Sequence, residues 1–192
     1  MREIALHILD LIENSLRAQA TLVAVNVEAL PSEDLLRIVI EDNGTGLTVP
    51  PEAALDPFYT TKRGKRTGLG LSLFRAAAES TGGGLKLGPS SLAAAGGVSS
   101  VEHPGLRVTV EMGLTHIDRN PLGDLAATLA SVVCTNPATN FQFRLRLAQR
   151  ECRIDVFALG AELGLGRNGG LAVAEHVAER IQSELKSSMV LT

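Results

Sequence analysis

The chain has 192 residues, of which 45% are hydrophobic and 20% are charged, and its formal net charge is −3. This length and composition fit one globular domain, or a domain with a smaller appendage, and exclude general disorder. The slightly acidic balance argues against bulk nucleic-acid binding. The sequence shows neither a signal-peptide pattern nor an apolar run that could span a bilayer, so we expect a cytoplasmic protein without membrane contacts.

Residues 3–19 have the pattern of an amphipathic helix. Apolar side chains recur at three- and four-residue spacing and can face a core. A second stripe along the same helix is polar and contains His7, Asp10, Asn14 and Arg17. Taken alone, this stripe is most simply a solvated helix face. Its chemistry also suits another role, because a carboxylate and a carboxamide one turn apart could hold an attacking water and a hydrated metal ion.

Residues 21–29 and 35–41 alternate apolar with polar positions and predict two strands joined as a hairpin. The second strand leads into a glycine-rich turn that runs from Asp42 to Gly46. Residues 47–66 lack a regular pattern, and their prolines break any helix, so we expect a basic loop or lid.

A second glycine-rich turn follows the lid, at residues 67–71, and opens a predicted helix over residues 69–80. Strands are predicted over residues 85–87 and 106–112, with a loop between them. Glycines let a backbone approach a ligand closely, and N–H groups at a helix start can receive phosphate oxygens. Two such turns joined by a basic connector therefore suit a phosphorylated ligand. The order of elements predicts an α+β sandwich, with helices on one face of a mostly antiparallel sheet.

Residues 115–192 are predicted to form a small α+β unit beside a first unit of residues 1–114. Its expected elements are a helix over 122–134, strands over 141–148 and 152–157, and a helix over 172–186. Cys134 and Cys152 are expected to be reduced thiols, since their spacing fits neither a metal site nor a disulfide framework.

Four segments of the first unit resemble the ATP-binding boxes of the GHKL superfamily, which includes DNA gyrase B, the heat-shock chaperone, histidine kinases and MutL. Residues 11–16, 42–46 and 67–72 are similar to the N, G1 and G2 boxes, and residues 56–62 are similar to the F box of histidine kinases. The resemblance covers roughly residues 1–113. It implies a Bergerat-type two-layer α/β sandwich that binds ATP and Mg²⁺. It also implies a stand-alone domain without the dimerisation and phosphoacceptor domain of histidine kinases, since only six residues precede His7.

The resemblance implies a role for each matched position. Asn14 would bind Mg²⁺, and Asp42 would accept a hydrogen bond from the adenine amino group, which suits a carboxylate because it has only acceptors. Without the other boxes, a turn-forming aspartate would be the preferred interpretation of Asp42. Gly44 and Gly46 would keep the backbone clear of the purine. The other implied nucleotide-binding positions are Thr60, Thr61, Lys62, Gly68, Leu69, Gly70 and Leu71.

Position 10 departs from the family pattern. Members that hydrolyse ATP usually place a glutamate four residues before the metal-binding asparagine, as general base, whereas this chain has Asp10. A carboxylate there could still orient water, with a shorter reach. Two functions stay open: a protein of histidine-kinase type that phosphorylates or regulates an unidentified protein partner, or a non-catalytic, nucleotide-dependent switch. The C-terminal unit would dock the partner, and a homodimer is also left open.

Overall fold

The computed structural model describes residues 3–47, 49–56, 69–92, 104–166 and 170–188. The helices are α1 (Ile4–Arg17), α2 (Pro51–Ala54), α3 (Leu69–Glu79), α5 (Leu125–Thr135), α6 (Val156–Glu162) and α7 (Gly170–Ser188). The strands are β1 (Leu22–Leu30), β2 (Leu35–Asp42), β3 (Gly84–Gly88), β4 (Leu106–Gly113), β5 (Asn140–Leu147) and β6 (Arg150–Asp155), and a 3₁₀ turn at Pro31–Glu33 joins β1 to β2.

The strands form one sheet in the order β3-β4-β2-β1-β5-β6. Neighbouring strands are antiparallel except β1 and β5, which run parallel. The predicted hairpin is present, and its register places Val23 opposite Asp42. The predicted α+β fold with a mostly antiparallel sheet is thus confirmed.

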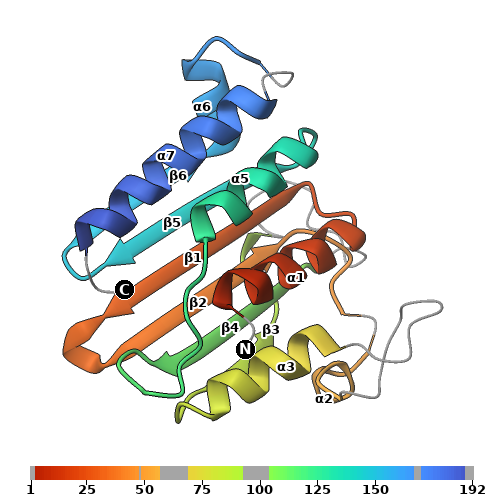
Figure 1. Ribbon diagram of the computed structural model, residues 1–192. Coiled ribbons are helices and arrows are strands. Elements are labelled where there is room, and N and C mark those ends of the chain that lie inside the picture. The colour runs from red at the N-terminus through yellow and green to blue at the C-terminus, as the bar shows by residue number, and fades with distance from the viewer. Residues whose placement is uncertain (1–2, 48, 57–68, 93–103, 167–169, 189–192) are drawn as a thin grey trace.

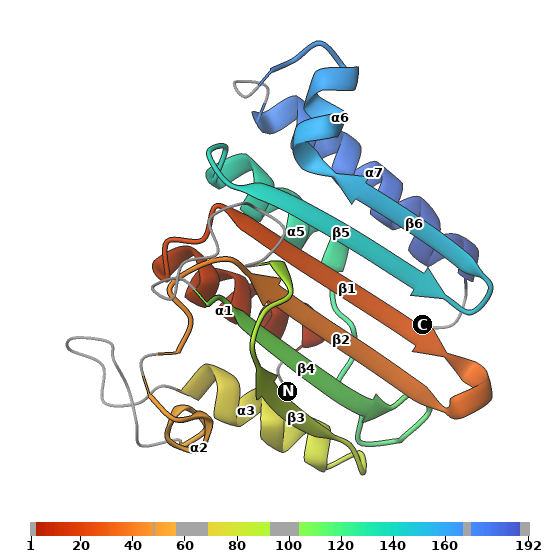
Figure 2. The same ribbon diagram turned by 180° about the vertical axis from the view of Figure 1, so that it is seen from behind.

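The molecule has two layers. Helices α1, α3, α5 and α7 lie side by side on one face of the sheet (Figure 1), and Figure 2 shows the sheet from its other face. Alternation along the strands explains this asymmetry. In β1, Val23, Val25 and Val27 point into the helix layer and are buried, whereas Asn26 and Glu28 point to the other face and are only partly buried. Among the described helices, none is both long and apolar enough to cross a bilayer.

The core lies between the helices and the sheet and contains residues from both ends of the chain. Among its largest fully buried side chains are Ile8, Phe74, Leu129, Phe141 and Leu145. Because β5 pairs with β1, residues after 114 extend the same sheet and contribute to the same core. A boundary between two units at residues 114 and 115 stays a prediction.

Aspartate N-cap residues set the first residue of two helices, α5 and α6. The strand predicted to reach residue 157 ends at Asp155, because the Asp155 carboxylate accepts a hydrogen bond from Ala158 N at 3.0 Å and caps α6. The helix predicted from residue 122 begins at Leu125 instead. There Asp124 accepts from Ala127 N at 2.9 Å. Both aspartates stand at the N-cap, where an acceptor satisfies a backbone N–H that the helix leaves unpaired.

Candidate nucleotide-binding site

Asp42 ends β2 with a buried carboxylate that is held from two sides. Its side chain is 3% exposed. Oδ2 accepts a hydrogen bond from Ser15 Oγ of α1 at 2.7 Å, and Oδ1 accepts one from Gly44 N at 2.9 Å. Two donors fix the orientation of the carboxylate but do not use all of its acceptor sites, because a carboxylate has about four lone-pair sites. Ser15 had no role in the sequence-based prediction.

The turn after Asp42 is tied to the start of β1 by Asn43. Its Oδ1 accepts hydrogen bonds from Thr21 N and Leu22 N, both at 2.9 Å, and its Nδ2 donates to Thr21 Oγ1 at 2.9 Å. The carboxamide thus closes the open end of the β1–β2 pair. This anchoring fixes the position from which the glycine turn leaves the sheet.

Gly44 and Gly46 lie where the chain leaves no space for a side chain. A Cβ on Gly44 would come within 2.5 Å of Ala18 O, at the end of α1. Gly46 has φ +71°, and a Cβ there would come within 2.8 Å of Gly105 O. Close backbone packing therefore requires glycine at both positions, whether or not a purine lies against them.

Asp10 lies on α1 beside the first turn of α3. A Cβ built on Gly70 would lie 3.6 Å from Asp10 Cβ and 3.7 Å from Asp10 Oδ2. The ring of His7, one turn earlier on α1, stacks on Phe74 of α3 with centroids 4.7 Å apart and planes inclined by 4°. His7 and Phe74 are both buried, so this stack sets how the two helices pack. It brings Asp10 to the end of α3 where backbone N–H groups give a partial positive charge.

Asn14, the predicted metal ligand, is in contact with Arg17 in this structure. Arg17 Nη2 donates a hydrogen bond to Asn14 Oδ1, and Arg17 Nη1 lies 3.4 Å from Glu13 Oε2. An amide oxygen that accepts from a guanidinium must give up that contact to bind a cation along the same direction. A cation that approaches Asn14 Oδ1 along that direction therefore requires Arg17 to move, whereas the second lone pair of the amide oxygen is not used by this contact.

Helix α1 joins the two glycine turns. Ser15 connects α1 to Asp42, Asp10 lies next to Gly70, and Asn14 stands between Asp10 and Ser15 along the helix. Leu69, Gly70 and Leu71 form the start of α3. Four predicted positions lie outside the described residues, namely Thr60, Thr61, Lys62 and Gly68.

The described residues contain no group of three or more His, Cys, Asp or Glu side chains that could hold a metal ion. This does not conflict with a magnesium role for Asn14. Mg²⁺ commonly takes only one or two ligands from the protein and fills its other positions with water and phosphate oxygens.

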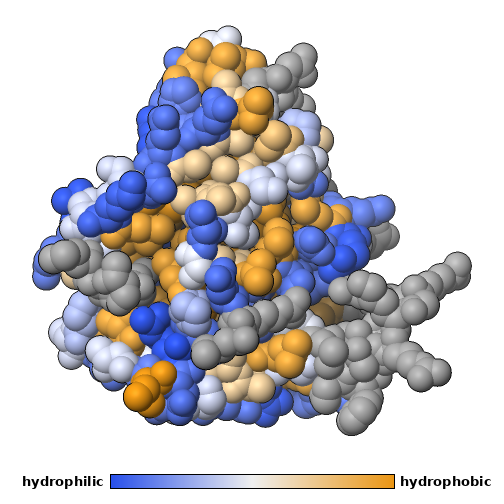
Figure 3. Space-filling view, in the orientation of Figure 1, coloured by the Kyte–Doolittle hydropathy of each residue, from blue (hydrophilic) through white to orange (hydrophobic). Residues whose placement is uncertain are grey.

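A cavity of about 310 Å³ lies elsewhere, between α5, α6 and the start of α7. It is lined by uncharged and mostly apolar residues, including Val133, Val156, Phe157 and Val173. Hydrophobic residues gather on the surface over α6 and the start of α7 (Figure 3), where Leu171 is exposed. Among the described residues that line this cavity, none is charged and Thr139 alone carries a polar side chain, which is a poor match for a nucleotide.

Several solved structures are similar to this chain at low sequence identity. One is the N-terminal domain of a DNA repair protein, with 13% identity and a TM-score of 0.52, and the match covers 82% of this chain and 52% of that one. Another is the Aquifex aeolicus MutL ATPase domain complexed with ADP, with 18% identity, a TM-score of 0.44, and coverage of 81% and 63%. A third is the topoisomerase IV ATP-binding domain of Francisella tularensis in complex with a small-molecule inhibitor, with 11% identity, a TM-score of 0.44, and coverage of 76% and 83%.

This chain therefore spans 52% of the first of these structures and 63% of the second. A search of curated protein sequences found no match. The sequence model of one protein family, described as "Histidine kinase-, DNA gyrase B-, and HSP90-like ATPase", matches residues 2–116, which is more than half of the chain. The chain belongs to this family of ATPases.

Proposed function

We propose that this chain binds Mg²⁺·ATP between α1 and the two glycine turns, and that it phosphorylates a partner protein or controls one through its nucleotide state. The observation that carries the proposal is the Asp42 carboxylate, buried and held by Ser15 and Gly44. Burying a carboxylate is costly unless its hydrogen bonds are satisfied. A carboxylate that keeps acceptor sites at the end of a strand is well suited to receive an amino group of a ligand.

The residues around this carboxylate fit Mg²⁺·ATP. Asp42 would receive the adenine amino group, and the first turn of α3, with Gly70 and Leu71, would receive phosphate oxygens through backbone N–H groups. A Cβ at Gly70 would meet Asp10 at ordinary contact distances, so the start of α3 lies close to the Asp10 side chain. The remaining contacts to the phosphates would come from Thr60, Thr61, Lys62 and Gly68.

Asn14 would bind the metal ion, and Asp10 would orient the attacking group. Mg²⁺ held at the Asn14 amide oxygen, beside or in place of the Arg17 guanidinium, would neutralise phosphate charge. Asp10 lies beside the first turn of α3, so it would orient a water or an acceptor hydroxyl near bound phosphates. Phosphoryl transfer needs mainly positioning and charge neutralisation from a protein, which these few groups can supply.

A second candidate function is a switch that binds nucleotide without turnover. The contact between Arg17 and Asn14 favours it, because the amide oxygen already accepts a hydrogen bond from the guanidinium. Nucleotide binding would then replace the hydrogen bond between Arg17 and Asn14 by contacts to the metal and the phosphates. Such an exchange can change a surface that a partner recognises.

Calorimetry with Mg²⁺·ATP tests the site. The wild type is expected to bind, and Asp42→Asn is expected to bind about 10- to 100-fold more weakly, because an amide replaces one acceptor by a donor. Asp124→Asn is the matched control: it makes the same charge change, and asparagine is an equally good N-cap. Absence of binding by the wild type, or equal binding by Asp42→Asn, would contradict the proposed site.

A timed assay with γ-labelled ATP separates the two functions. Release of ADP, or label on a partner protein, indicates an enzyme, and Asp10→Asn should then slow turnover by about 10²- to 10⁴-fold with little change in affinity. Tight binding without turnover indicates the switch.

A further inference from the structure

Strand β6 is the outermost strand at one end of the described sheet, and β5 is its neighbour there. The backbone N–H groups of Asn140 and Ala148, at the start of β5 and just after its end, donate at 2.9 Å to Thr21 O, just before β1, and to Ala29 O of β1. Backbone groups alternate in direction along a strand. The even-numbered residues of β5 therefore bond to β1, and the odd-numbered ones bond to β6.

This alternation fixes which groups of β6 point away from the sheet. Leu145 of β5 stands opposite Cys152 of β6, so the backbone of Cys152 bonds to β5. Glu151 and Arg153, on either side, then direct their N–H and C=O groups outward. Their side chains lie on the sheet face that the helices leave uncovered, because Leu145 and Cys152 point into the helix layer.

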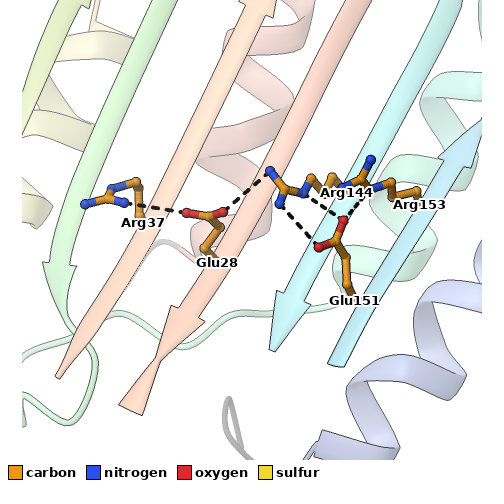
Figure 4. Close-up of polar contacts among 5 residues, drawn as sticks. All are labelled: Glu28, Arg37, Arg144, Glu151 and Arg153. Atoms are coloured by element: carbon orange, nitrogen blue, oxygen red, sulfur yellow. Dashed lines mark hydrogen bonds and ion pairs between the residues drawn. The ribbon is translucent and has the colours of Figure 1, made fainter. Parts of the chain in front are cut away.

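On that uncovered face, charges of alternating sign cross the sheet to this edge (Figure 4). Nitrogen–oxygen distances along the row are 2.8 Å for Arg37–Glu111, 3.6 Å for Arg37–Glu28, 3.7 Å for Arg144–Glu28 and 3.1 Å for Arg144–Glu151. The row ends at Arg153, which also pairs with Glu151 and whose side chain is 72% exposed. A positive charge thus stands at the outer edge, next to outward-pointing backbone groups.

We propose that β6 pairs antiparallel with β6 of a second copy of this chain, about a two-fold axis that passes beside Cys152. In this register Glu151 stands opposite Arg153 of the second copy, and Arg153 stands opposite its Glu151. Both residues have outward backbone groups, so each pair exchanges N–H···O bonds and also joins opposite charges. The alternating row of charges then continues into the second copy.

Neighbouring registers of the same pairing are less favourable. An axis beside Arg153 places the two Arg153 side chains opposite each other, and Glu151 opposite Asp155, so like charges meet at each pair. An axis beside Ile154 uses Asp155, which already accepts from Asn140, Gln142 and Ala158, and β6 ends there. Charges on an edge strand also discourage unspecific pairing. Of the registers about Cys152, Arg153 and Ile154, the one about Cys152 pairs opposite charges at both charged positions and keeps residues 150–154 of each copy within β6.

Helix α7 packs over this edge of the sheet (Figure 1). It contacts both β5 and β6, and an ion pair of 2.9 Å between Arg150 and Glu184 holds it over the edge strand.

Sedimentation equilibrium of the full chain over a range of concentrations tests the proposal. The wild type is expected to show a monomer–dimer equilibrium. Glu151→Arg and Arg153→Glu should each raise the dissociation constant at least about tenfold, because each places like charges opposite each other at two symmetric pairs. The double variant with both reversals restores opposite charges and should return to within about threefold of the wild type.

Lys86→Glu is the matched control, since it makes the same charge change as Arg153→Glu on β3 at the opposite edge of the sheet. It should leave the dissociation constant unchanged. A chain that stays monomeric up to high micromolar concentration would overturn the proposal. So would a dimer that Arg153→Glu leaves intact, or one that Lys86→Glu weakens equally.

Cross-linking gives a second readout that does not depend on charge variants. Residues directly opposite in a non-hydrogen-bonded pair have Cα atoms about 4.5 Å apart, within the roughly 4.4–6.8 Å that a disulfide spans. Copper phenanthroline, which removes two electrons from the two thiols as their protons leave, should link Cys134→Ser chains through Cys152 into a dimer that dithiothreitol reverses. Desolvation raises the pKa of the Cys152 thiol, so the oxidation is run above neutral pH.

Cys152→Ser, which retains Cys134, should give no such dimer. If Cys134 alone cross-links and Cys152 alone does not, the copies do not meet at β6. Neither experiment involves nucleotide, so its outcome is independent of the function proposed above.

Discussion

Ser15 Oγ on α1 donates a hydrogen bond of 2.7 Å to Asp42 Oδ2 at the end of β2, and both residues are buried. The same hydroxyl lies 3.3 Å from Leu11 O, one turn back along α1. This contact joins the first helix to the strand that ends at the first glycine turn. The position of the Asp42 carboxylate therefore depends on how α1 packs.

Ser15→Ala is expected to destabilise the protein by about 1–3 kcal/mol, because it leaves a buried carboxylate oxygen with one donor fewer. Urea unfolding measures this cost. Ser131→Ala, an exposed serine on α5, is the control and should change stability by less than about 0.5 kcal/mol. If Asp42 binds adenine, Ser15→Ala should also weaken ATP binding. Equal unfolding curves for the two variants would contradict the structural role of Ser15.

Gly44→Ala is expected to cost about 1–3 kcal/mol, because the new Cβ would come within 2.5 Å of Ala18 O, which belongs to the backbone and cannot rotate away. Gly84→Ala is the matched change, since a Cβ there meets nothing within 4 Å. It should be neutral or stabilise by up to about 1 kcal/mol. Thermal unfolding compares the stability of the two variants with that of the wild type. Tolerance of Gly44→Ala would show that the turn can move away from α1.

Local patterns predicted the elements of residues 1–113 well wherever the structure describes them. Alternating valines indicated β1, three- and four-residue spacing indicated α1, and the order of elements indicated helices on one face of the sheet. Each of these signals lies within a short window of sequence. The family resemblance likewise rested on short segments, and the match of the family to residues 2–116 confirms it.

Contacts between distant residues were not predictable in the same way. Ser15 and Asp42 are separated by 27 positions, and β1 pairs with β5 across more than 100 residues. No short window contains both partners of such a contact. Helix α6 was not predicted at all, for another reason: Val156 and Phe157 favour a strand, and the cap formed by Asp155 overrides that preference. The predicted roles of Asp10, Asn14 and Asp42 stay predictions.

The stack of His7 on Phe74 should make Phe74 a large contributor to stability. Phe74 is fully buried between α3 and the sheet, so Phe74→Ala is expected to cost about 3–5 kcal/mol. Leu73→Ala, at the neighbouring position that is 41% exposed, should cost no more than about 1 kcal/mol. Unfolding in guanidinium chloride measures the free energy of unfolding of both variants. A loss below about 2 kcal/mol for Phe74→Ala would mean that α3 repacks without this ring.

The charges at the β6 edge should make stability depend on pH in a defined range. Hydrogen bonds from Arg144, then from Arg153, lower the pKa of Glu151 from 4.5 to about 2. A carboxyl whose pKa is lower in the folded state stabilises the fold above its unfolded pKa and loses this effect as the pH falls through the folded pKa. The contribution of Glu151 is therefore complete above about pH 4.5 and disappears towards pH 2.

Glu151→Gln removes this charge while keeping the shape of the side chain. The melting temperature of the wild type should exceed that of Glu151→Gln near pH 6, and the difference should close as the pH falls from about 4.5 to about 2. The effect should be small and should shrink in high salt, because the side chain of Glu151 is exposed to solvent. Measurements at low protein concentration keep the chain monomeric, so the difference reports the ion pairs within one copy. A difference that stays constant down to pH 2 would show that the carboxylate is not what Arg144 and Arg153 stabilise.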